Sequence, residues 1–245
     1  MNFFHNIGLY FIMLKKMFDK PTKWSVMRQL IIKDTEDTVV NSLGIISFVS
    51  FFIGGVITIQ MALNMTGSLY PKYLIGFATR EIIILEFAPT IISIIMAGKV
   101  GSFITSSIGS MRVTEQIDAL EVMGVNSINY LVFPKVIALL LYPFLISIAM
   151  FLGILGGMAA CVYGGYSTVD NFITGIQTEF ISFHMTYAFI KTFVFGLIIA
   201  TVPSFHGYYM KGGALEVGKA NTTSFIWTCV CIIIINYVLT QILLG

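Results

Sequence analysis

The sequence predicts an all-α integral membrane protein, with an amino-terminal interfacial helix, five transmembrane helices and one short cytoplasmic helix. Of the 245 residues, 57% are hydrophobic and only 11% are charged, whereas a soluble domain carries about 25% charged residues. Long apolar runs recur along the chain. They are continuous rather than alternating, which favours helices over the strands of a membrane barrel.

Five segments satisfy the length of about 20 apolar residues that a spanning helix needs. Three of them carry no Asp, Glu, Lys or Arg: 39–63, 136–163 and 221–244. The segment 82–109 contains only Glu86 and Lys99 as charged residues, and 185–208 contains only Lys191. The sequence therefore predicts five crossings within one membrane domain, 38–245.

The Lys and Arg residues between the segments predict the orientation. Residues 1–37 hold six of them, and the connections 110–135 and 209–220 hold two each. The connections on the other side hold Lys72 and Arg80. Because cytoplasmic flanks carry the excess of basic residues, we expect a cytoplasmic amino terminus and, after five crossings, a carboxyl terminus outside.

The region 1–37 precedes the first crossing. Its apolar run 3–14 is too short to span a bilayer, and Lys15 and Lys16 follow that run, whereas a signal peptide has its basic residues first. Beyond Pro21, apolar residues recur at helical spacing among basic ones. This pattern is typical of an amphipathic helix that lies in the headgroup plane.

A short polar helix is predicted at about 112–123, between two crossings. One face is apolar and another carries three acids at a spacing of three, with Thr114 as a possible cap and Gly124 as a stop. Acids are unfavourable against an anionic leaflet, so a protein partner with a basic groove explains them better. The apolar face consists of Val113, Ile117, Leu120 and Met123, and the acids are Glu115, Asp118 and Glu121.

Catalytic and metal-binding patterns are absent from the sequence. The three His residues are far apart, the three Cys residues lie in apolar runs, and the net charge of +2 is too small to indicate a nucleic-acid partner. The stretch 213–219 fits the first part of a P-loop, but Ala220 stands where Mg²⁺ binding needs Ser or Thr. We therefore predict no catalytic residue, no metal and no cofactor in this chain.

Three charged side chains fall inside predicted crossings, and each costs about 2.5–3.5 kcal/mol at a helix centre. Glu86 and Lys99 are 13 residues apart in the sequence, about 20 Å along a helix, so they cannot pair. Lys99 can snorkel to the inner interface. Glu86 is too short to do so, and Pro89 after it predicts a kink or a break. A cavity position is the better interpretation of Glu86.

Four stretches together resemble the MlaE family, the permease subunits of ABC transporters that work with MCE proteins. The similarity covers about residues 20–245, and its most specific part is the acidic helix. The stretches are Glu86-Phe-Ala-Pro89, Ala97-Gly-Lys-Val-Gly-Ser102, Val113-Thr-Glu-Gln-Ile-Asp-Ala-Leu-Glu121 and Gly213-Ala-Leu-Glu-Val-Gly218-x-Ala220-x-Thr-Thr223.

This resemblance implies a homodimer in the bacterial inner membrane that moves phospholipid and maintains lipid asymmetry. Two cytoplasmic ATPase subunits, which bind ATP and Mg²⁺, would dock beneath it, and an MCE protein would sit on the periplasmic side. The short acidic helix would be the coupling helix that each ATPase grips. Its docking residues would be Glu115, Gln116, Asp118, Ala119, Leu120 and Glu121.

The predicted topology places Gln60, Glu86 and Asn236 at similar depth near the periplasmic face. We expect them to line a lipid cavity between the two copies, although amides such as Gln60 and Asn236 also commonly bond helix to helix. The chain departs from many relatives at Leu85, Ser107 and Asn236, where they have Arg, Glu and Asp. All three departures reduce the charge in the membrane.

An alternative function is an ion-coupled secondary transporter that acts without an ATPase and uses Glu86 as its proton site. Inverted repeats would support it. The sequence contains no such repeat, and five crossings do not divide evenly.

Overall fold

The computed structural model describes residues 3–19, 22–65 and 70–244, and it is 86% helical. Five helical runs are long and apolar enough to cross a membrane: Trp24–Asn64, Tyr73–Val113, Ser127–Tyr163, Ser182–Tyr208 and Ala214–Leu243. No strand occurs in these parts of the chain. The predicted all-α membrane fold with five spanning helices is therefore confirmed.

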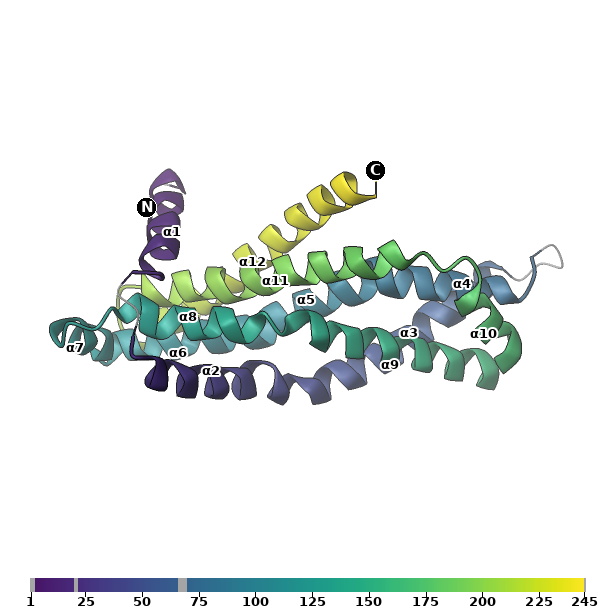
Figure 1. The fold of residues 1–245 in the computed structure, drawn as a ribbon, viewed down its shortest axis with the longest axis horizontal. Coiled ribbons are helices and arrows are strands. Elements are labelled where there is room, and N and C mark those ends of the chain that lie inside the picture. Colours follow the sequence, from purple (N-terminus) through teal and green to yellow (C-terminus); the bar gives the residue numbers. More distant parts are fainter. Residues whose placement is uncertain (1–2, 20–21, 66–69, 245) are drawn as a thin grey trace. The chain divides into compact units, whose positions relative to one another are not determined.

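The helices follow one another with short connections (Figure 1). In chain order they are α1 (Phe3–Lys16), α2 (Trp24–Thr38), η1 (Val40–Ser42), α3 (Leu43–Asn64), α4 (Tyr73–Ile82), η2 (Ile83–Ile91), α5 (Ile92–Met96), η3 (Ala97–Gly101), α6 (Ser102–Val113), α7 (Gln116–Val122), α8 (Ser127–Leu139), α9 (Tyr142–Tyr163), α10 (Val169–Gln177), α11 (Ser182–Tyr208) and α12 (Ala214–Leu243).

The chain forms two compact units, each built from three separate stretches. The first unit comprises 1–41, 94–142 and 194–238, and the second comprises 42–93, 143–193 and 239–245. The first unit contains the amino-terminal helices and the short helix α7. The second contains α3, α4, α9, α10 and the embedded residue Glu86.

In the first unit, α2 packs along α8. Their contact includes an ion pair 2.8 Å long between Lys135 Nζ and Asp34 Oδ1, with both side chains mostly buried. Met27 on α2 is also buried, whereas Trp24 is exposed. The amino-terminal region thus contains two helices, α1 and α2, and its position in the headgroup plane stays a prediction.

In the second unit, glycines bring α3 and α9 into backbone contact. A Cβ atom on Gly54 would lie 2.0 Å from the carbonyl oxygen of Gly153, and one on Gly156 would lie 1.9 Å from that of Phe51. No side chain larger than hydrogen fits at those distances. The small residues of α9 therefore serve close helix packing, as is common in membranes.

The second crossing departs from α-helical geometry at Pro89. Residues Ile83–Ile91 form a π-helix that contains this proline, and Ala97–Gly101 form a second one. The interruption of the α-helix that was expected at Pro89 takes the form of a wider helical turn. π-Helical turns are rare in proteins, and those that do occur are often found at functional sites.

Candidate functional site

The short helix α7 begins later than the sequence predicted. Arg112 and Val113 end α6, and α7 spans Gln116–Val122. Thr114 is not its cap, because its hydroxyl donates to the carbonyl of Ser110 at 2.9 Å and so belongs to the end of α6. Glu115 precedes α7 in the left-handed conformation, with φ 58°. A reversal of backbone hand thus separates α6 from α7.

One side chain anchors α7, and two others project from its end. Ile117 is completely buried, whereas Val122 is 89% exposed and Met123 is 68% exposed. The predicted apolar face Val113, Ile117, Leu120 and Met123 is therefore not buried as a whole. Because Val122 and Met123 are apolar and open, they suit contact with another chain.

The three acids of this segment have different roles. Glu121 Oε1 accepts hydrogen bonds from Ser127 Oγ and from the Tyr208 hydroxyl, both at 2.9 Å. These bonds connect α7 to α8 and α11. Burial and the nearby Glu121 carboxylate raise the pKa of Tyr209, which is next to Tyr208. Glu121 is therefore an acceptor for two neighbouring helices and helps to fix the position of α7, although the residue itself is exposed.

The other two acids remain open to contact. Asp118 Oδ1 pairs with Arg112 at 2.8 Å, and its side chain is 56% exposed. Glu115 is exposed, as are Gln116 and Ala119, while Leu120 is half-buried. The predicted docking residues therefore lie together on α7 and just before it. Glu121 is exposed as well, but its Oε1 is already bonded to Ser127 and Tyr208.

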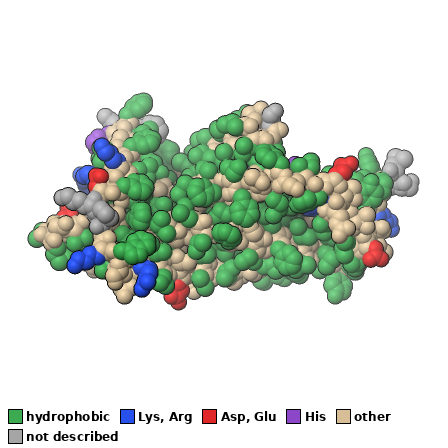
Figure 2. Space-filling view, viewed as in Figure 1, with side chains coloured by type: hydrophobic (Ala, Val, Ile, Leu, Met, Phe, Trp, Pro, Cys, Tyr) green, Lys and Arg blue, Asp and Glu red, His purple; other side chains and the backbone are tan. Residues whose placement is uncertain are grey.

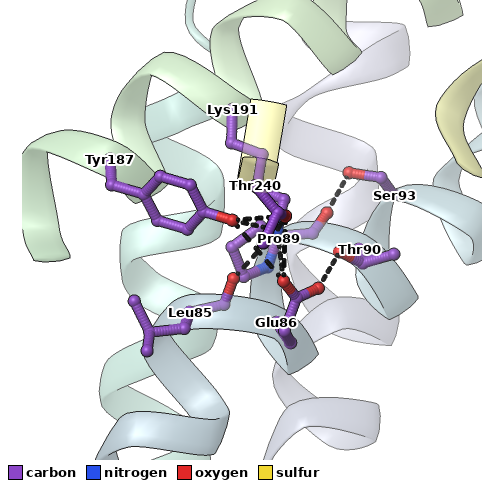
Figure 3. A network of polar contacts seen from close by, with 8 residues as sticks. All are labelled: Leu85, Glu86, Pro89, Thr90, Ser93, Tyr187, Lys191 and Thr240. Carbon is purple, nitrogen blue, oxygen red and sulfur yellow. Dashed lines mark hydrogen bonds and ion pairs between the residues drawn. The ribbon is translucent and has the colours of Figure 1, made fainter. Parts of the chain in front are cut away.

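The second site surrounds Glu86 in the second unit (Figure 3). Lys191 on α11 is completely buried, and its Nζ lies 2.8 Å from Glu86 Oε1 on η2. The same ammonium donates to the Tyr187 hydroxyl at 2.7 Å. From α12, the Thr240 hydroxyl lies 3.3 Å from Glu86 Oε1. Glu86 remains 45% exposed, so its carboxylate links a buried cation to an open surface.

Pro89 contributes to this site through the group it lacks. In an α-helix its nitrogen would donate to the carbonyl of Leu85, but proline has no N–H. Lys191 Nζ instead donates to that carbonyl at 3.1 Å. On the other side, the Thr90 hydroxyl donates to Glu86 Oε2 at 3.1 Å. The proline and the π-helix thus position polar groups around the ammonium.

Sequence reasoning identified Glu86 and Lys191 as embedded charges but did not pair them. The sequence nevertheless contained a signal for this pairing, namely the depth of each residue within its crossing. Glu86 lies four residues inside the crossing that begins at 82, and Lys191 lies six residues inside the one that begins at 185. The five-crossing prediction runs these two crossings in the same direction, which would place the two residues at similar depth. The cation beside Glu86 comes from α11.

The remaining polar candidates lie on different helices. Gln60 is exposed on α3, and Asn236 is half-buried on α12, one helical turn before Thr240. Lys99 donates from η3 to the carbonyl of Asn41, which gives its ammonium a protein partner. That Gln60, Glu86 and Asn236 line one cavity stays a prediction.

Arg80 is a further buried cation in the second unit. It is 1% exposed, and its guanidinium donates to the carbonyls of Ile176 at 2.6 Å and Thr178 at 2.8 Å. It also pairs with Glu81. Arg80 therefore holds the carboxyl end of α10, a role that its position at the edge of a predicted crossing did not indicate.

Comparison with known proteins gives consistent matches over most of the chain. The family model "Permease MlaE" matches residues 31–242. A probable ABC transporter permease protein of Rickettsia bellii is 33% identical over 206 residues, which are 82% of this chain and 78% of the relative. A probable ABC transporter permease protein of Synechocystis is 33% identical over 82% of this chain and 77% of the relative.

A plant relative matches as well. The chloroplastic protein TRIGALACTOSYLDIACYLGLYCEROL 1 of Arabidopsis thaliana is 32% identical over 86% of this chain and 60% of its own length. The matched range contains η2 with Glu86, the segment around α7, and α11 with Lys191. The chain therefore belongs to the MlaE permease family and is a membrane-spanning permease subunit of an ABC transporter.

Proposed function

We propose that this chain moves phospholipid between the bacterial inner membrane and a periplasmic MCE protein, and so contributes to the lipid asymmetry of the outer membrane. It acts as a homodimer above two cytoplasmic ATPase subunits, which bind ATP and Mg²⁺. Its amino terminus is cytoplasmic and its carboxyl terminus is periplasmic. The chain itself performs no hydrolysis.

The observation that carries the proposal is the geometry of α7. A seven-residue helix is anchored by buried Ile117 and by the bonds of Glu121, and it presents Val122 and Met123 to the outside. A rigid helix with an exposed apolar end can transmit a push from a docked ATPase. A loosely held loop could not do so.

Two observations support a lipid cargo. The name of the Arabidopsis relative contains a glycerolipid, trigalactosyldiacylglycerol. The half-exposed Glu86 carboxylate, backed by buried Lys191, offers polar contacts to a headgroup. Ile, Phe and Met side chains are abundant in the chain. All three offer apolar contacts to acyl chains, and the flexible Met side chain can adapt its packing to them. A lipid cavity lined by Gln60, Glu86 and Asn236 fits these features.

Co-purification tests the proposal. A tagged chain is expected to recover an ABC ATPase, and the double variant Val122→Asp with Met123→Asp is expected to lose most of it. Both residues are exposed, so the fold should persist. The charges would instead be buried in the docking groove, where an unpaired charge costs several kcal/mol.

A matched control is Val169→Asp on α10. Val169 is the first residue of that helix, where an acidic side chain is favoured by the helix dipole. This variant should recover the ATPase in full. Recovery of the ATPase by the α7 double variant at wild-type level would refute α7 as the coupling helix.

Lipid transfer gives the second readout. Reconstituted complex with ATP should exchange labelled phospholipid with the MCE protein, and the α7 double variant should not. If transfer proceeds without any ATPase and follows a proton gradient, the ion-coupled alternative with Glu86 as its proton site is correct instead.

A further inference from the structure

Two adjoining pockets lie between α1, α11 and α12 in the first unit. The apolar pocket has a volume of about 310 Å³, and its walls include Ile7, Tyr10, Val202, Trp227 and Ile235. The polar pocket has a volume of about 300 Å³, and its walls include Lys211, Glu216 and Lys219. Each volume falls at the lower end of the range for ligand sites. Figure 2 shows that hydrophobic side chains cover much of one face of the molecule.

The two pockets are parts of one site, because they share three wall residues. Asn6, Phe205 and His206 border both. The apolar part extends along α12 from Trp227 to Ile235, about 12 Å at the rise of an α-helix. A ligand that fills both parts needs a polar end and an apolar chain.

The shared wall contains an unused polar group. Asn6 Oδ1 is buried and has no hydrogen-bond partner in the described part of the chain. A buried polar atom without a partner is unfavourable. Because Oδ1 is an acceptor, it calls for a ligand that carries a hydrogen-bond donor, such as a hydroxyl of a lipid headgroup, beside its anionic phosphate. Tyr10 does not compete for that role, because its hydroxyl already bonds Thr201 Oγ1 at 2.7 Å.

The charge of the polar pocket favours an anion. Lys219 is paired with Glu216 at 2.7 Å. Lys211 is exposed and forms no ion pair with any residue that the structure describes. One uncompensated positive charge therefore remains at the mouth of the pocket.

The position of the pockets fits a lipid of the inner leaflet. Lys211 and Lys219 belong to the connection 209–220, whose basic residues place it on the cytoplasmic side. From there the apolar pocket follows the spanning helices α11 and α12 into the hydrocarbon region. α1 has 14 residues, which is too short to span, and it closes the pocket along one side.

We propose that α1, α11 and α12 bind one anionic phospholipid of the cytoplasmic leaflet, with its phosphate at Lys211 and one acyl chain in the apolar pocket. This site lies within a single chain. It is separate from the periplasmic cavity proposed above for the cargo and does not need that cavity, but its place in the cytoplasmic leaflet rests on the membrane orientation proposed above.

Two native cysteines provide the test. Cys231 lines the apolar pocket, whereas Cys229, two residues earlier on α12, is not part of its wall; both thiols are partly exposed. The full chain with its co-purified partners is placed in nanodiscs of phosphatidylethanolamine that contain a trace of phosphatidylglycerol with a thiol-reactive group midway along one acyl chain. Peptide mass spectrometry then measures the adduct on each cysteine.

We expect at least about ten times more adduct on Cys231 than on Cys229. Lys211→Glu should lower the Cys231 adduct about tenfold, and Val202→Trp, which fills the apolar pocket, should lower it as much. Lys23→Glu makes the same charge change at an exposed lysine outside both pockets and should leave the adduct unchanged.

Four results would overturn the proposal. Equal adducts on the two cysteines would mean contact with bulk lipid only. An equal yield from the matching phosphatidylethanolamine probe, or no effect of Lys211→Glu, would exclude recognition of the anionic headgroup. Suppression of the adduct by excess oleate, but not by excess unlabelled phosphatidylglycerol, would assign the site to a fatty acid.

Discussion

Lys191 carries a charge into the membrane-spanning part of α11, and Glu86 offsets it. The ammonium is completely buried and is surrounded by the Glu86 carboxylate, the Leu85 carbonyl and the Tyr187 hydroxyl. Lys191 Nζ also lies 4.8 Å from the centre of the Tyr187 ring, which is within the range of a cation–π interaction. A lysine in such a setting depends on its counter-ion, because a buried charge without one is strongly unfavourable.

Glu86→Gln should therefore destabilise the protein. Removing one partner of a buried pair costs about 3–5 kcal/mol, and we expect the lower end, about 3 kcal/mol, because Glu86 is half exposed. Thermal unfolding in detergent measures the loss. The double variant Glu86→Gln with Lys191→Met should recover most of it, since no unpaired charge remains. Unchanged thermal stability of the single variant would show that the ion pair contributes nothing.

At the residue scale, the sequence identified which polar groups matter more readily than their partners. Glu86 and Lys191 stand out because charges are rare in spanning helices. The pair joins two helices 105 residues apart in sequence, and Glu86 was compared only with Lys99 on its own helix. Tyr208 and Ser127 were missed as partners of Glu121 because neutral hydroxyls at helix ends give no distinctive pattern.

At the element scale, the contact between α3 and α9 depends on atoms that glycine lacks. The oxygens facing Gly54 and Gly156 belong to the backbone, so they cannot move aside as a flexible side chain would. Any larger residue must push the two helices apart. The second unit therefore depends on these glycines for its helix spacing.

Gly156→Ala should destabilise the second unit by about 1–3 kcal/mol, the usual cost of overpacking, since its Cβ would meet the Phe51 oxygen at 1.9 Å. The matched control is Gly44→Ala on α3, where the new Cβ would have no heavy atom within 4 Å other than its own chain neighbours and the nearby backbone of its own helix. Alanine favours helix over glycine, so this variant should be neutral or stabilising by up to about 1 kcal/mol. The melting temperature in detergent measures the stability of each variant. Equal changes in melting temperature for Gly156→Ala and Gly44→Ala would contradict the packing argument.

The start of α7 shows why element boundaries are harder to predict than elements. Periodicity correctly placed a helix in 112–123, but α6 extends to Val113 and the chain reverses at Glu115. A positive φ is uncommon outside glycine, so nothing in the sequence pointed to Glu115. Its conformation follows from the positions of the two helices it joins.

At the scale of the whole molecule, the five crossings were predicted from hydropathy, and their ends from charge. The third helical run begins at Ser127, whereas its apolar core was placed at 136–163. Lys135 marked that boundary, but its pairing with Asp34 lets the helix continue through it. A charged residue therefore does not by itself end a helix, and this helical run extends beyond the apolar core that hydropathy identifies.

The basic residues between the crossings predict the orientation of the chain in the membrane. Site-specific cysteine labelling tests this orientation. Met123 and Tyr163 are the best positions, because Met123 is 68% exposed beside α7 and Tyr163 is 91% exposed at the end of α9. Ser127 is a poor choice on the cytoplasmic side, since it is buried and bonded to Tyr208. The parent chain, with its three native cysteines, sets the background.

A membrane-impermeant maleimide added to spheroplasts should label Tyr163→Cys, and should label Met123→Cys only after the membrane is opened. One helical run, α8 with α9, separates the two positions, so a single crossing must place them on opposite sides. The reverse pattern would invert the orientation and move α7 away from any cytoplasmic ATPase. Labelling of both positions in spheroplasts would remove that crossing and leave the basic connections divided between the two sides, which the positive-inside rule disfavours.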